Sequence, residues 1–240
     1  MPRNAANAQL RWYFTNKAEE DVTDIDIFDV IGGDGYWEDG ITAKDFIEQL
    51  RAVTTSKIHL HINSPGGYVN DGLAMYNAIR QHEADITAFI ESQAASAASF
   101  VAMAADRVMI AKTAKLFIHD AHGFAWGNAS DMRALADILD EESNNIAGIY
   151  ADRAGGTVEE WREAMQRDGI GTTYRGQAAV DAGLADEVTV EPGRKNLQAL
   201  RVAAMQARRS GEPTVSEPAT VEPEPIDYRA LFQGAFAHRL

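Results

Sequence analysis

The chain has 240 residues, of which 45% are apolar and 24% are charged, and these fractions are ordinary for a globular protein with a substantial core. The formal net charge of −14 repels phosphate and anionic lipid, so nucleic acids and membrane surfaces are poor candidate partners. Since the chain has no cysteine, thiol catalysis, Cys-ligated zinc and disulfide bonds are excluded.

The ends of the chain differ in composition from its middle. The N-terminal residues lack the apolar core of a signal peptide, and no stretch reaches the ~20 apolar residues that cross a bilayer, so we expect a cytoplasmic protein. Five of the seven prolines fall in residues 191–240, which predicts a flexible tail. Near its end, a short apolar pattern indicates either a docking segment or a partly ordered terminus (Tyr228, Leu231, Phe232 and Phe236). We therefore predict an N-terminal segment (1–23), one domain (24–190) and a tail (191–240).

Strands and helices are predicted to alternate through the domain. Period-two patterns and short apolar runs predict strands at residues 25–31, 57–62, 86–90, 108–110, 116–118 and 184–190. Helical spacing and capping signals predict helices after Thr42, Gly67 and Ser96, over residues 130–153, after the Thr157–Glu160 capping box, and before Gly183. Repeated strand–turn–helix units predict a mainly parallel sheet covered by helices.

Two of the strand-to-helix turns have the character of a ligand site. In Pro65-Gly66-Gly67, paired glycines leave backbone N–H groups uncovered by any Cβ, and in Ala95-Ser96-Ala97 a hydroxyl lies at the start of a helix among small residues. A serine nucleophile needs a base and N–H donors for the oxyanion. His119 ends an apolar strand, and the ordinary pKa of histidine suits general base catalysis near neutral pH.

Other chemistry has less support in the sequence. Gly66-Gly67 is not followed by Gly-Lys-Ser/Thr, so nucleotide hydrolysis is not indicated. His59 and His61 share one strand face and could bind a metal, but no third ligand at a telling spacing accompanies them. We therefore predict neither a metal nor a cofactor. Taken alone, Ser96 is also compatible with close helix packing, and His119 with a structural hydrogen bond.

Three motifs in order resemble the ClpP peptidase family. They are Ile-Asn-Ser-Pro-Gly-Gly67, then Gln-Ala-Ala-Ser96-Ala97, then Val-Met-Ile and Leu-Phe-Ile-His119, where the family has I-N-S-P-G-G, G-Q-A-A-S-M and V-M-I-H. The resemblance implies Ser96 as nucleophile, His119 as base, and the N–H groups of Gly67 and Ala97 as the oxyanion hole. Ala97 replaces the usual Met, which leaves its N–H unchanged, and Ser92 replaces the usual Gly before the nucleophile.

The resemblance gives two positions for the catalytic acid. Counting forward from His119 reaches Asp168, whereas counting backward from the last short helix reaches Gly171, and the difference implies an insertion within residues 169–173. Asp168 is the only carboxylate between Glu163 and Asp181, so it is assigned as the acid, with a cap or a solvated side chain as its alternative role. Otherwise the site would be a dyad, or Asp120 or a neighbouring subunit would supply the acid.

The resemblance also implies an α/β fold, the ClpP/crotonase-like core of repeated β-β-α turns, with residues 130–153 as a protruding handle helix. The divergent N-terminal region, the insertion and the Pro-rich tail are similar to the head-maturation proteases of tailed phages and prophages, which cleave capsid and scaffold proteins in the host cytoplasm. The expected partners are a polypeptide substrate, copies of the chain in a heptameric or tetradecameric ring, and a separate ATPase if one is needed. Two alternatives remain: a crotonase-type acyl-CoA hydratase or isomerase, and an inactive ring-forming scaffold.

Overall fold

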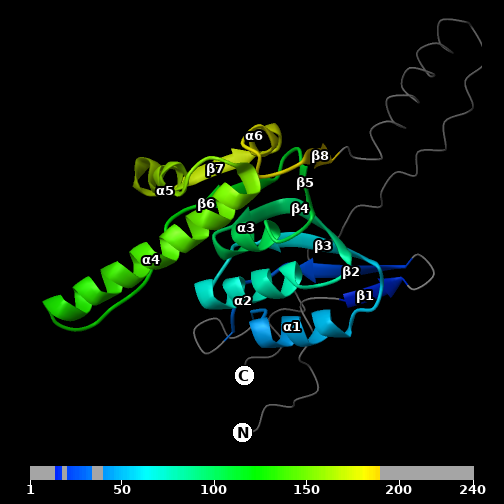
Figure 1. The fold of residues 1–240 in the computed structure, drawn as a ribbon, viewed down its shortest axis with the longest axis horizontal. Helices are drawn as coiled ribbons and strands as arrows, with labels where there is room; N and C mark the ends of the chain where they lie inside the picture. Colours follow the sequence, from blue (N-terminus) through cyan, green and yellow to red (C-terminus); the bar gives the residue numbers. More distant parts are fainter. Residues whose placement is uncertain (1–13, 18–20, 34–39, 190–240) are drawn as a thin grey trace, which may run out of the picture. The chain divides into compact units, whose positions relative to one another are not determined.

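The computed structural model describes residues 14–17, 21–33 and 40–189. Contacts along the chain divide it into residues 1–190 and residues 191–240, and every described residue belongs to the first unit (Figure 1). The tail that the composition predicts therefore lies outside the described residues.

A single eight-stranded sheet carries the first unit. Strands β2, β3, β4, β5 and β8 pair in parallel in that order, β1 is antiparallel to β2, and β6 pairs in parallel with the end of β4 and antiparallel with β7. The mainly parallel α/β fold predicted from the alternating pattern is confirmed. The strands are β1 (Phe14–Lys17), β2 (Val22–Ile27), β3 (Lys57–Ser64), β4 (Asp85–Ala95), β5 (Arg107–Ala111), β6 (Lys115–Ile118), β7 (Thr172–Arg175) and β8 (Glu187–Thr189).

Two helices, α1 and α5, begin at the caps that the sequence indicates. Thr42 accepts a hydrogen bond from the Asp45 N–H, and Thr157 and Glu160 form the predicted capping box. The helices are α1 (Ala43–Ala52), α2 (Val69–Arg80), α3 (Ala97–Ala102), α4 (Ala129–Ala154), α5 (Val158–Gln166), a 3-10 turn (Arg167–Gly169) and α6 (Gln177–Asp181). Among the described helices, none combines the length and apolar character needed to span a bilayer.

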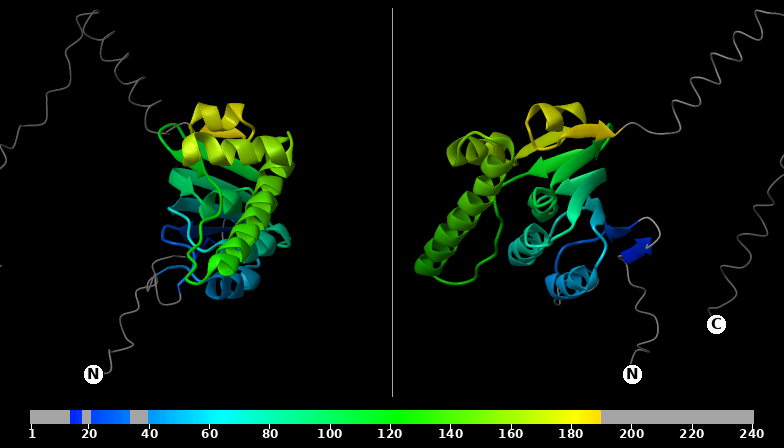
Figure 2. Two further views of the ribbon diagram at one scale, coloured as in Figure 1. Left: turned by 90° about the vertical axis from the view of Figure 1, so that its left-hand side faces the viewer. Right: turned by 45° about the vertical axis from the view of Figure 1, so that its right-hand side comes forward.

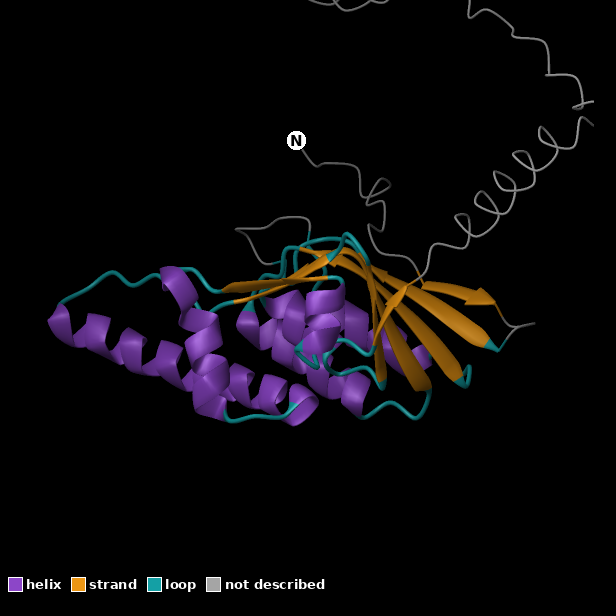
Figure 3. Cartoon of the chain, turned by 90° about the horizontal axis from the view of Figure 1, so that it is seen from above, coloured by secondary structure: helices purple, strands orange, loops and turns teal. Residues whose placement is uncertain are grey.

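The two faces of the sheet differ in what covers them. Along β3, Ile58, Leu60 and Ile62 are buried, whereas the residues between them are only partly buried. Helices α1, α2 and α3 pack against the buried face, and the opposite face carries no helix among the described residues (Figure 3). His59 and His61 therefore lie on the face of the sheet that carries none of the described helices.

Helix α4 leaves the sheet as an arm. Its carboxyl-terminal half is buried through Ile146, Ala147 and Tyr150, whereas its first half is mostly exposed. The loop that leads into α4 runs back along the helix (Figure 2). It approaches the helix closely at Gly123, where a Cβ would touch the Leu135 and Leu139 side chains.

Some strand boundaries differ from the prediction. The strand expected at residues 25–31 begins earlier, at Val22, and ends at Ile27, and Ile31 instead forms isolated bridges to Ile41 and Gly67. The strand expected at residues 184–190 is described over Glu187–Thr189. Strands β1 and β7 were not predicted, because each has four residues and no run of apolar side chains.

Candidate active site

Ser96 lies on the turn between β4 and α3. Its backbone has φ 53° and ψ −127°, a conformation that residues with a Cβ rarely adopt. Hydrogen bonds hold the turn on both sides: the Ser96 N–H donates to the Phe117 carbonyl at 2.9 Å, and the Ser99 N–H donates to the Ser96 carbonyl at 2.9 Å. A sharp turn of this kind presents the serine side chain at the end of the strand.

Gly66 and Gly67 pack directly against this turn. A Cβ on Gly66 would lie 2.6 Å from the Ser96 Cβ, and a Cβ on Gly67 would collide with the backbone of Ile31. Both glycines have positive φ, so the close approach and the conformation each require the absence of a side chain. The N–H groups of Gly67 and Ala97 donate to no other residue in the described part of the chain. They are therefore available to a ligand beside Ser96.

His119 is the first residue after β6. Since β4 and β6 are parallel, with Ala95 opposite Phe117, Ser96 and His119 both follow the carboxyl ends of neighbouring strands. The His119 Nδ1–H donates to the main-chain carbonyl of Asp120 at 2.6 Å. Because a carbonyl can only accept, the proton of the neutral ring is on Nδ1, and Nε2 keeps the lone pair that a general base needs.

The surroundings of His119 keep its imidazole neutral. Burial is the largest cause and lowers the pKa of His119, and the His122 ring, stacked at 4.6 Å between centroids, lowers it further. The hydrogen bond to the Asp120 carbonyl and the Asp120 carboxylate act in the opposite direction. The pKa of His119 remains below its ordinary value, so the ring is unprotonated at neutral pH.

One cavity of about 390 Å³ joins these residues. A larger hollow of about 570 Å³, beside Asp21 and His82, contains none of them. The structure thus brings Ser96, His119 and Gly67 together, as the motifs predict, while their catalytic roles remain predictions. The lining of the smaller cavity is Pro65, Gly67, Tyr68, Val69, Ser96, Phe100, His119, Asp120, Ala121, His122, Ile146 and Tyr150.

Asp168 does not line this cavity. It is exposed, within the 3-10 turn, with φ 56° and ψ 18°. The residue beside His119 is Gly171, since a Cβ there would lie 2.7 Å from the His119 Cβ and would also collide with the Ile118 carbonyl oxygen. The backward count therefore identifies the position that faces the histidine, and that position has no side chain. The role of Asp168 as the acid stays a prediction.

Asp120 is the carboxylate that does line the cavity. Its Oδ2 accepts hydrogen bonds from Arg162 at 3.1 Å and Gln166 at 2.9 Å, both from α5, while its buried Oδ1 has no partner among the described residues. The sequence signal for Asp120 is its place directly after His119. The sequence did not predict that the Asp120 main-chain carbonyl accepts the hydrogen bond from His119. Every residue has such a carbonyl, and only the path of the backbone decides where it points.

Comparison with known proteins agrees with these motifs. A model of the Clp protease family matches residues 38–192. Over 136 residues, the chain is 29% identical to the ATP-dependent Clp protease proteolytic subunit of Chlorella vulgaris, covering 56% of this chain and 66% of the relative. Over 133 residues, it is 32% identical to the protein of the same name from Ligilactobacillus salivarius (strain UCC118), covering 55% and 66%. The chain thus spans just under two thirds of the length of these curated relatives. Since the family match extends over more than half of its residues, the chain belongs to the Clp protease family.

Proposed function

We propose that the chain is a serine endopeptidase in which Ser96 is the nucleophile and His119 is the general base. The observation that carries this proposal is the single cavity shared by a serine on a strained turn and a neutral histidine. The N–H groups of Gly67 and Ala97, which donate to no other described residue, are the proposed oxyanion hole. Membership of the Clp protease family supports the same chemistry.

The proposed reaction follows from the positions of the protons. Ser96 Oγ attacks the carbonyl carbon of the peptide bond while His119 Nε2 takes the hydroxyl proton. The oxyanion accepts hydrogen bonds from the two N–H groups, and the imidazolium then gives its proton to the leaving amine. The same histidine then takes a proton from a water molecule whose oxygen attacks the acyl carbon, and it gives this proton to Ser96 Oγ as the ester bond breaks and the acid product leaves.

The group that orients His119 is part of the proposal. In the arrangement described, the Asp120 carbonyl accepts from Nδ1–H and so fixes the tautomer that the reaction needs. The Asp120 carboxylate lies near enough to raise the pKa of His119, so it also stabilises the imidazolium. Asp168 would act as the acid only if the turn at Arg167–Gly169 moved toward the histidine.

The assembly and the partners are proposed from the relatives and from α4. The relatives are named as proteolytic subunits of an ATP-dependent protease. We propose that this chain likewise forms a homo-oligomeric ring of seven or fourteen copies, acts on polypeptides and depends on a separate ATPase if unfolding is needed. The exposed first half of α4 supports a contact between copies.

The biological role that we propose is head maturation in a tailed phage or prophage, within the host cytoplasm. Its support is the sequence: the insertion within residues 169–173 and the Pro-rich residues 191–240 set this chain apart from a general housekeeping subunit. The test is to incubate the chain with a capsid or scaffold protein encoded by a neighbouring gene and to detect cleavage by mass spectrometry. Intact capsid and scaffold proteins after incubation with active enzyme would contradict it.

Peptide hydrolysis tests the proposed activity. The full chain should hydrolyse an unstructured protein substrate such as casein, and Ser96→Ala should abolish hydrolysis while the assembly keeps its mass, because only the hydroxyl is lost. A parallel assay measures hydration of an enoyl-CoA thioester and so tests the crotonase-type alternative. Hydration of the thioester without peptide hydrolysis would overturn the proposal, and so would full peptide hydrolysis by Ser96→Ala.

A further inference from the structure

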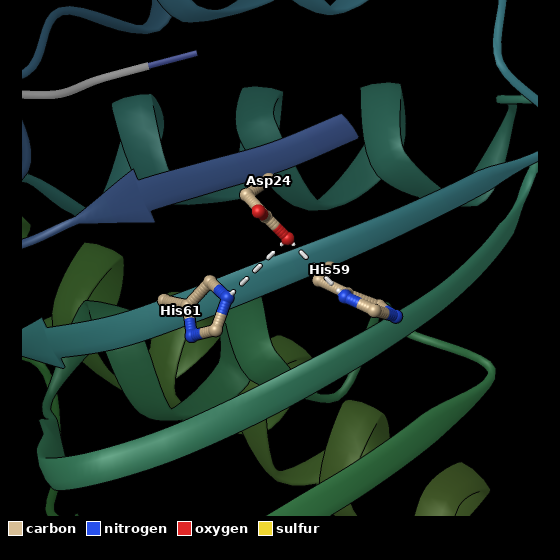
Figure 4. A group of neighbouring side chains, drawn as sticks. All are labelled: Asp24, His59 and His61. Carbon is tan, nitrogen blue, oxygen red and sulfur yellow. Dashed lines mark hydrogen bonds and ion pairs between the residues drawn. The ribbon is translucent and has the colours of Figure 1, made fainter. Parts of the chain in front are cut away.

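A cluster of polar side chains lies on the face of the sheet that carries none of the described helices. Asp24 on β2 pairs with His59 on β3, and His61 lies two residues further along the same strand (Figure 4). The sequence shows no third ligand at a telling spacing beside the two histidines. The parallel pairing of β2 with β3 supplies one, Asp24, from 35 residues earlier in the chain.

The distances within the cluster suit a metal ion. Asp24 Oδ1 lies 3.2 Å from His59 Nδ1 and 3.7 Å from His61 Nε2, and the three ligand atoms all lie within 4.8 Å of one another. Ligands in a tetrahedral zinc site with bonds of about 2.0–2.1 Å are separated by about 3.3 Å. A cation at the centre of the cluster would therefore need only small side-chain rotations.

Neighbouring residues orient the histidines. The Nδ1–H of His61 donates to Glu91 Oε1 at 2.7 Å, so the lone pair of the neutral ring is on Nε2, the atom nearer Asp24. Metal-binding histidines commonly donate the N–H of their other ring nitrogen to a carboxylate, which fixes the orientation of the ring. The ring of Phe89 packs against both imidazoles, with 5.3 Å between its centroid and that of each.

We propose that Asp24, His59 and His61 form a binding site for a divalent transition metal of the zinc type. Two imidazoles and one carboxylate are ligands that zinc binds, and three protein ligands leave a fourth position open to water. The site is accessible, because 37% of the His59 side chain and 25% of the His61 side chain are exposed. The metal would join β2 to β3 across the sheet, and the site is independent of the peptidase proposal.

Zinc itself is the first probe. Untagged full-length chain, stripped with a chelator and titrated with zinc chloride in a calorimeter, should bind one ion per chain. At a hundredfold excess over Kd, the ion should raise Tm by at least about 4 °C, because it binds the folded chain in preference to the unfolded one. The proposal would be overturned if micromolar zinc neither bound stoichiometrically to the chain nor raised its Tm.

Variants locate the site. His59→Gln and His61→Gln should lose stoichiometric binding, Asp24→Asn should weaken it, and Glu91→Gln should weaken it about tenfold to a hundredfold as a positioning residue. Circular dichroism checks that each variant is folded. Because a hydrogen-bonded cluster without a metal would also lose stability in these variants, the decisive quantity is the rise in Tm that zinc causes in each of them.

The control is the other histidine pair, where His122 stacks on His119. His122→Gln should keep one zinc per chain and the full rise in Tm. Loss of binding in His122→Gln, with binding kept in His61→Gln, would place the ion in the peptidase cavity and overturn the proposal. Cobalt(II) gives a further readout on the unmodified chain: a strong visible band of a four-coordinate ion supports the site, and the weak spectrum of hydrated cobalt contradicts it.

Discussion

His119 receives its orientation from a main-chain carbonyl rather than from a carboxylate. Both groups accept from Nδ1–H, so both select the tautomer that leaves Nε2 as the base. A carbonyl has no full charge, however, and it stabilises the imidazolium of the transition state less than a carboxylate does. The Asp120 carboxylate compensates only in part, since Arg162 shares its charge. In the proposed mechanism, the site therefore combines a well-placed base with weaker support for its protonated form.

The pKa of His119 predicts how activity depends on pH. Burial is the largest cause that lowers this pKa, and His122 adds to it. The ring is a base only when unprotonated, so activity is present above the pKa and is lost as pH falls through it. We expect the acidic limb of kcat/KM against pH to have its midpoint below about 6.5, and His122→Gln to move it upward. A midpoint above 6.5 in the unmodified enzyme would contradict this account.

Asp168 and Asp181 form a matched pair for testing the acid. Both are exposed, and neither lines the cavity. Since Nδ1 of His119 already has an acceptor, we expect Asp168→Asn to reduce kcat by less than about tenfold and Asp181→Asn to leave it unchanged. Kinetics on a short fluorogenic peptide measure both. A loss of several orders of magnitude in Asp168→Asn alone would mean that the turn moves toward His119 in the active state, and that Asp168 is the acid after all.

At the scale of elements, the contact between the end of β6 and the start of β7 holds the histidine in place. Gly171 has φ 111° and lies against His119, so Gly171→Ala should displace both backbones, lower the free energy of unfolding by about 1–3 kcal/mol and remove most of the activity. Gly148 lies within α4, where an added methyl group would meet no atom within 4 Å, and Gly148→Ala should be neutral or stabilise by up to about 1 kcal/mol. Urea denaturation measures the free energy of unfolding of both variants. Equal values would show that Gly171 is not needed to hold His119 in place.

The elements that the sequence predicts well are those whose signals are local. The alternation along residues 57–62, the Thr42 cap and the Thr157–Glu160 box each lie within a few residues, and each is found in the structure. Strand β7 has no such signal, because its place is set by antiparallel pairing with β6, more than fifty residues away. The meeting of Asp24 with His59 depends in the same way on the register between β2 and β3.

In the candidate site too, features with a local sequence signal are predicted, whereas those that depend on the path of the backbone are not. The motifs around Gly67, Ser96 and His119 identify residues that the structure brings to one cavity. The acid could not be located in the same way, because a count along the chain does not show which of Asp168 and Gly171 the loop places beside the histidine. Only the backbone path through residues 169–171 answers that question, and it places Gly171 there.

At the scale of the whole molecule, the arm formed by α4 is the feature through which we propose that copies of the chain associate. Large apolar side chains are exposed on this arm and on the loop before it, and an exposed apolar surface of this kind supports the proposed contact between copies. They are Phe124, Trp126, Met132 and Ile138.

Substitution of one of these residues should dissociate the assembly. Ile138 is 55% exposed on the arm, and we expect Ile138→Glu to reduce the mass found by light scattering to that of smaller species. Ile170 is 69% exposed but lies outside the arm, so Ile170→Glu serves as the control and should keep the mass of the unmodified protein. An unchanged mass in Ile138→Glu would show that the arm does not join the copies.

A fluorophosphonate probe measures most directly whether His119 activates the hydroxyl of Ser96. The probe forms a covalent bond with a serine only when its hydroxyl is activated. We expect mass spectrometry to find one adduct per chain on Ser96, no adduct in Ser96→Ala, and labelling at least about a hundredfold slower in His119→Ala. A folded chain that stays unlabelled, or one labelled equally fast without His119, would contradict the account.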